Sequence, residues 1–73
     1  MTDIHIGHMI KDELERQNKT VVWLACKLSC HRTNVYRIFD RPFIETDQLL
    51  RISIILNRDF FAEYSAYLSQ NWV

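Results

Sequence analysis

Side chains that can form paired hydrogen bonds gather in one short stretch of the chain, between residues 31 and 37. An arginine can donate two hydrogen bonds to guanine, an asparagine can pair in the same way with adenine, and a threonine can contact either base or a thymine methyl group. Each good pairing discriminates against a wrong base by about 1 to 3 kcal/mol. If these side chains share one exposed helix face, they are suited to reading DNA bases. The alternative interpretation is that they form an ordinary solvated helix face with no ligand. The candidates for base contacts are His31, Arg32, Thr33, Asn34 and Arg37.

A second set of residues around this stretch is suited to DNA phosphates, which fix position without reading sequence. These residues are Lys19, Thr20, Lys27, Tyr36 and Arg41, although Tyr36 could equally cover the core. The formal net charge of the 73-residue chain is zero, so the whole molecule is not the basic particle typical of nucleic-acid binding. Residues 27–41 nevertheless hold four basic residues and one acidic residue, which leaves five basic and eight acidic residues elsewhere. The positive charge is therefore local.

The hydrophobic pattern predicts an all-α fold, with a single domain over residues 1–73 and no strand. Apolar residues recur at helical spacing, Thr20 and Asp59 are suitable amino-terminal caps, and Pro42, the only proline, marks a turn. The predicted helices cover about residues 5–18, 20–28, 31–39, 45–56 and 59–70. A tight turn between the second and third, with the small Ala25 allowing close approach, would make residues 20–39 a helix-turn-helix.

The order and spacing of several motifs resemble the phage repressor and Cro-type (XRE-type) family of helix-turn-helix proteins. The resemblance covers about residues 6–62 and rests on Ile6-Gly7, Thr20, Leu24-Ala25, the run 32–38 and the run 49–53. It implies a compact five-helix, lambda-repressor-like domain that regulates transcription, usually as a homodimer on a near-palindromic operator. In such dimers the recognition helices enter successive major grooves about 34 Å apart. The same resemblance puts His31 at the start of the recognition helix, residues 32–34 in its first turn and Arg37 one turn further on.

The chain departs from this family in the second helix and in the turn. Val21, Val22 and Trp23 stand where outward polar residues are common, so a phosphate contact is expected to be missing. Ser29 replaces the glycine usual in the turn, and therefore it either adopts the left-handed backbone at some cost or the turn is built differently. His31 is also a weaker helix cap than serine, threonine or aspartate.

Apolar side chains in the C-terminal region exceed what one small domain readily buries. This surplus favours a homodimer through the C-terminal region. Trp23 could be a partly covered edge of the core or part of an exposed patch for a protein partner. The second reading gives an alternative function, a protein-interaction module of helix-turn-helix shape, for example an antitoxin-like or co-regulator subunit. The candidate dimer or partner surface comprises Trp23, Ile54, Ile55, Tyr64, Tyr67, Leu68 and Trp72.

Other classes of function find little support in the sequence. No catalytic nucleophile, base and orienting acid can be assembled from plausible neighbours, and no glycine-rich phosphate loop exists, so an enzyme is not expected. Cys26 and Cys30 are separated by three residues rather than the two usual for zinc ligands, and we expect free thiols, no metal and no cofactor. No apolar run reaches the roughly 20 residues that span a bilayer, and no secretory segment is visible. We therefore expect a cytoplasmic protein that binds double-stranded DNA, with no membrane association and no small-molecule ligand.

Overall fold

The computed structural model describes residues 4–72, and within this range it contains five α-helices and no strand. The all-α prediction is confirmed. The helices are α1 (Ile6–Arg16), α2 (Val21–Lys27), α3 (Arg32–Phe39), α4 (Thr46–Leu56) and α5 (Phe61–Gln70). Their bounds lie within two residues of the predicted ones. The largest difference at an amino end is in α5, which begins two residues after Asp59, although the Asp59 carboxylate still accepts a hydrogen bond from the Ala62 amide at 3.2 Å.

Local side-chain chemistry fixes where α2 and α3 begin. The Thr20 hydroxyl accepts a hydrogen bond from the Trp23 amide at 3.0 Å, as an amino-terminal cap does. At the start of α3, His31 Nδ1 accepts from the Thr33 amide at 3.1 Å. Between the two helices, Ser29 adopts the left-handed backbone with φ of 55°. The turn therefore keeps the geometry expected of a glycine there, and the serine carries the associated strain.

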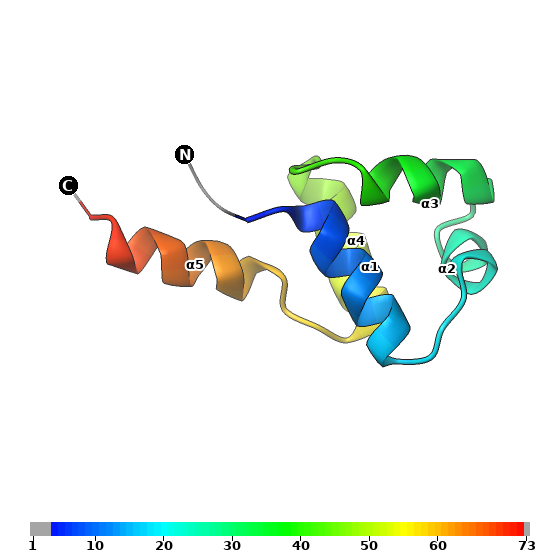
Figure 1. Ribbon diagram of the computed structural model, residues 1–73, viewed down its shortest axis with the longest axis horizontal. Coiled ribbons are helices and arrows are strands. Elements are labelled where there is room, and N and C mark those ends of the chain that lie inside the picture. Colours follow the sequence, from blue (N-terminus) through cyan, green and yellow to red (C-terminus); the bar gives the residue numbers. More distant parts are fainter. Residues whose placement is uncertain (1–3, 73) are drawn as a thin grey trace.

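The core lies where α1, α2, α3 and α4 meet (Figure 1). Its fully buried side chains come from every one of these helices and from the segment before α5: Ile6, Ile10, Leu24, Val35, Ile52, Leu56 and Phe60. Gly7 allows α1 to lie directly against the end of α3, because a side chain there would overlap the Ile38 and Phe39 carbonyls. Its amide donates to the Arg41 carbonyl in the following loop at 2.9 Å. The Ile6 amide donates to the Pro42 carbonyl at the same distance. These bonds hold the carboxyl end of α3 in place.

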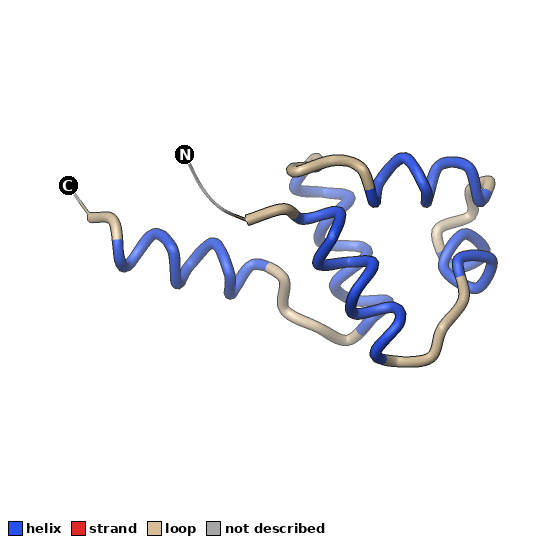
Figure 2. Tube along the Cα trace, in the orientation of Figure 1, coloured by secondary structure: helices blue, strands red, loops and turns tan. Residues whose placement is uncertain are grey.

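The last helix extends away from the other four (Figures 1 and 2). Its anchor is Phe60, which is fully buried, whereas α5 itself contributes no buried residue. The molecule measures 41 × 20 × 20 Å, with a radius of gyration of 12.6 Å. A compact chain of this length would have a radius of gyration of about 11 Å. The projecting α5 accounts for the elongation.

A buried carboxylate connects α1 to the junction between α4 and α5. Glu13, on α1, is only 2% exposed and is paired with Arg16 and, at 2.9 Å, with Arg58. Gln17 donates to the same carboxylate at 2.7 Å and to the Leu56 carbonyl at 2.7 Å. Hydrogen bonds from Arg16, Gln17 and Arg58 outweigh the effect of burial and lower the pKa of the Glu13 carboxyl from 4.5 to about 2.

Because of the Glu13 carboxylate, the free energy of unfolding should depend on pH in the acid range. Because the pKa of Glu13 is lower in the folded chain, its stabilisation is complete above about pH 4.5 and is lost as the pH falls toward 2. We expect Glu13→Gln to lower the free energy of unfolding by about 1 to 3 kcal/mol near neutral pH. Urea unfolding followed across this pH range should show the wild-type and variant curves converging toward the acid end. Glu15→Gln, an exposed change on the same helix, is the control. Equal stability of wild type and Glu13→Gln at neutral pH would contradict the assignment.

Candidate nucleic-acid interface

The third helix is held against the rest of the molecule by one side only. Val35, Ile38 and Phe39 are buried, and every other residue of α3 is exposed. The helix lies along the edge of the molecule next to α2, with its outer side open to solvent (Figure 1). This arrangement follows from the helical spacing of its three apolar residues. It leaves a continuous polar surface on α3.

All five residues predicted to contact bases are exposed on or beside α3. At 3.6 residues per turn, Thr33 and Arg37 lie on the side opposite the buried residues. Arg32 lines a shallow hollow together with Val22 and Cys26 of α2, whereas Asn34 lines a recess next to α4. The predicted readers therefore spread across α3 from the α2 side to the α4 side.

One ring nitrogen of His31 already takes part in contacts within the protein. Besides capping α3, its Nδ1 lies 2.8 Å from the Thr33 hydroxyl oxygen. One ring nitrogen and one hydroxyl group are thus already engaged with each other before any ligand arrives. Arg32 and Arg37 remain the side chains of this set with the most hydrogen-bond donors to offer, since each guanidinium carries five.

No family model, no curated protein and no solved structure matches the chain.

The residues predicted to bind phosphates occupy three places. Thr20 uses its hydroxyl as the α2 cap, and Tyr36 is 55% exposed with its ring edge-on to Phe39, the ring centres 6.2 Å apart. The ammonium groups of Lys19 and Lys27 lie 4.9 and 5.8 Å from the centre of the Trp23 ring. A cation at this distance from an indole face is attracted by the ring. Arg41 follows α3 and is exposed.

The predicted dimer or partner surface divides into two groups. Trp23, Ile55 and Tyr64 are half-buried and pack against the core, and Tyr67 is half-buried on α5. Burial raises the pKa of the Tyr64 hydroxyl. The second group is truly exposed: Ile54 (71%), Leu68 (52%) and Trp72 (72%). Sequence reasoning missed Leu50, which is 50% exposed one turn before Ile54 on α4.

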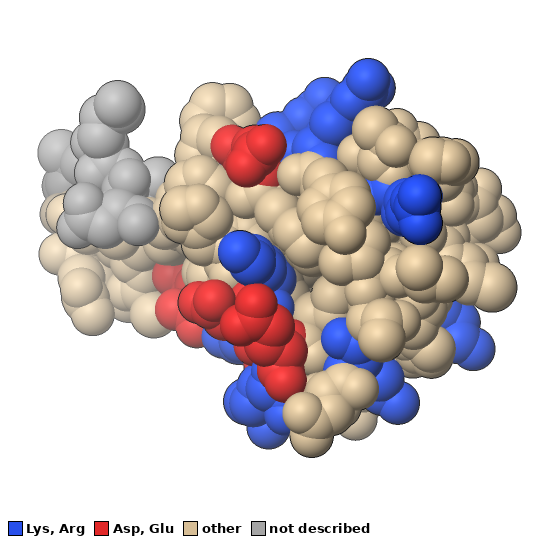
Figure 3. Space-filling model, turned by 45° about the vertical axis from the view of Figure 1, so that its right-hand side comes forward, with Lys and Arg blue, Asp and Glu red and all other residues tan. Residues whose placement is uncertain are grey.

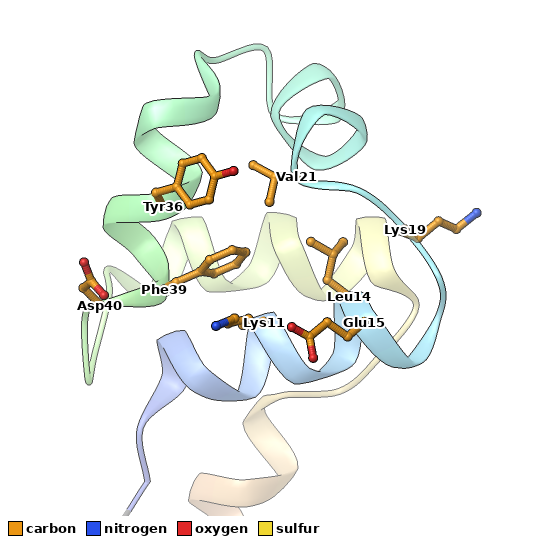
Figure 4. Close-up of a pocket in the computed structure, with 8 residues that line it drawn as sticks. All are labelled: Lys11, Leu14, Glu15, Lys19, Val21, Tyr36, Phe39 and Asp40. Atoms are coloured by element: carbon orange, nitrogen blue, oxygen red, sulfur yellow. The ribbon is translucent and has the colours of Figure 1, made fainter.

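Charge is unevenly distributed over the surface. On the face drawn in Figure 3 the acidic side chains lie in the left half of the view with basic side chains between and below them, and the charged side chains of the right half are all basic. The groove in Figure 4, about 270 Å³ in volume, lies between α1, α2 and α3 over Leu14, Val21 and Phe39. Its rim carries Lys11 and Lys19 but also Glu15 and Asp40, so it presents no net charge.

The thiols and helices of residues 4–72 bear on metal and membrane binding. Cys26 is exposed and Cys30 half-buried, and both are free thiols. Within those residues no group of three or more histidine, cysteine or acidic side chains is placed to hold a metal ion. The described helices also include none that is both long and apolar enough to span a bilayer.

Proposed function

We propose that this chain is a sequence-specific double-stranded DNA-binding regulator of transcription that inserts α3 into the major groove. The observation that carries the proposal is the exposed polar side of α3: Thr33 and Arg37 lie opposite its three buried apolar residues, and Arg32 is exposed on the side toward α2. A helix reads the major groove only if it protrudes in this way and carries donors and acceptors that match base edges. In this proposal α2 is the supporting helix of a helix-turn-helix.

The proposed assembly is a homodimer through the C-terminal region. Leu50 and Ile54 on α4, Leu68 on α5 and Trp72 after it are each at least half exposed. Association of two copies through these residues would remove their apolar side chains from water. Because α5 projects from the other helices, it is accessible to a second copy (Figure 2).

The alternative proposal is a protein-interaction module that binds a different chain. The exposed apolar residues of α4 and α5 could contact a different chain as readily as a second copy of this one. Trp23 supports it less, because this side chain is half-buried against the core and covered by two lysines. If Trp23 were the centre of a docking surface, Trp23→Ala would abolish partner binding and leave duplex affinity unchanged.

Selection of duplexes from a random pool tests the proposal. We expect enrichment of an inverted repeat whose half-sites are centred about 10 base pairs, or a multiple of that, apart, as two symmetric recognition helices require. Binding to the enriched duplex should fall steeply between about 50 and 200 mM salt, since phosphate contacts release counterions. Failure to bind any duplex at low salt would overturn the proposal. Enrichment of single, unrepeated half-sites would leave DNA reading intact and contradict the dimer.

A further inference from the structure

A recess of about 250 Å³ lies between α3 and α4, beside the surface proposed to read bases. Its apolar floor comes from Leu28 and Ile38, which are both buried. A phosphate group with several water molecules fits this volume, since one water occupies about 30 Å³ in the liquid. The recess is open to solvent and was not anticipated from the sequence.

Two rows of side chains face each other across the recess. Asn34 and Arg37, three residues apart on α3, and Arg41 in the turn after this helix line one wall. Gln48 and Arg51 are three residues apart on α4 and line the opposite wall. Arg51 Nη2 donates a long hydrogen bond, of 3.4 Å, to the Leu28 carbonyl.

The chemistry of the walls is that of an anion site. Three guanidinium groups and two side-chain amides line the recess, and no carboxylate does. Across residues 4–72 the only ion pairs found join Arg16 and Arg58 to Glu13 and Glu63, so none of these three arginines is neutralised by an ion pair. Guanidinium groups match the geometry of phosphate oxygens through paired hydrogen bonds.

We propose that this recess binds one phosphate group and that, in the complex with DNA, the group is a backbone phosphodiester beside the major groove. The second half of this statement rests on the proposed function. Asn34 and Arg37 belong both to the recess and to the candidate reading surface, so a duplex lying on α3 brings a phosphate within their reach. In this arrangement Asn34 and Arg37 contact the DNA backbone instead of bases, and Arg32 and Thr33 are the principal base readers.

Arg51 is the residue to change, because it lies on α4 and is not a candidate base reader. We expect Arg51→Gln to weaken binding about tenfold, equally for all duplexes, and to reduce the slope of log affinity against log salt by about one. Gln48→Glu, which adds a carboxylate without altering Arg51, should act in the same direction. Arg51→Lys should retain part of the affinity, and Lys11→Gln, an exposed change on α1, should have no effect. Circular dichroism would verify that each variant is folded.

A second arm uses inorganic phosphate alone and does not depend on DNA. In nuclear magnetic resonance titrations, phosphate should shift the signals of Arg37, Gln48 and Arg51 in the wild type, and Arg51→Gln should weaken this response. Addition of duplex should abolish it. If phosphate shifts these signals but no duplex binds, the phosphate site stands and the proposed function fails.

The two arms also distinguish the source of the phosphate. A nucleoside monophosphate that binds at least tenfold more tightly than inorganic phosphate, together with unchanged duplex affinity in Arg51→Gln, would overturn the backbone assignment in favour of a phosphorylated small molecule. If Arg51→Gln matched the wild type in both the salt slope and the phosphate response, the recess would not be a phosphate site at all.

Discussion

Replacing Arg32 and Arg37 together with alanine should reduce affinity for the selected duplex by at least about a hundredfold. A hydrogen bond that involves a charged group such as guanidinium contributes about 1.5 to 3 kcal/mol, and every 1.4 kcal/mol is a factor of ten in affinity. Both side chains are exposed, and neither contributes to the core, so the double variant should fold. Fluorescence anisotropy with labelled duplex at fixed salt measures the loss.

The two single variants should affect duplex binding in different ways. Arg32→Ala is expected to relax the preference at one base pair, because a base contact is lost. Arg37→Ala, whose side chain also lines the recess beside α4, is expected to weaken all duplexes together. Lys11→Ala is the matched loss of one exposed positive charge on α1 and should change affinity little. A double variant that binds within a few-fold of wild type would rule out α3 as the reading helix.

Much of the fold could be predicted because helix formation and burial here follow local rules. The apolar spacing of α1 and α3 matches the residues found buried, and Thr20 caps α2 as its residue type suggests. Even Ser29, which lacks the conformational freedom of glycine, keeps the left-handed turn. The surrounding helix contacts evidently impose that conformation more strongly than the side chain opposes it.

The parts of the site that escaped prediction depend on contacts between distant segments. Gln48 and Arg51 become phosphate candidates only when α4 faces the Asn34 side of α3, and spacing within one helix does not reveal that. Trp23 could be either core or surface by sequence, and its half-burial under Lys19 and Lys27 depends on how α2 packs. The buried Glu13 has no signal in the sequence, because its partner Arg58 lies 45 residues away.

The largest expected loss of stability comes from Gly7→Ala. A methyl group at this position would lie 2.3 Å from the Ile38 carbonyl oxygen and 2.4 Å from that of Phe39. These are backbone atoms, so no side-chain rotation can relieve the overlap, and α1 would have to separate from the end of α3. Overpacking of this kind typically costs 1 to 3 kcal/mol, and we expect about 3 here. A chain of this length is usually stable by only about 4 to 11 kcal/mol.

Thermal unfolding followed by circular dichroism should therefore show Tm lowered by roughly 10 to 20 °C in Gly7→Ala. Alanine is intrinsically the better helix former by about 1 kcal/mol, so any loss of stability comes from the contact with α3 and not from α1 itself. Asp12→Ala, at an exposed position of the same helix, should stay within about 0.5 kcal/mol of wild type. If Gly7→Ala were as stable as Asp12→Ala, the close approach of α1 to α3 would be wrong. Because this approach also fixes the carboxyl end of α3 through the Gly7 and Ile6 amides, the same variant should weaken duplex binding even at temperatures where it remains folded.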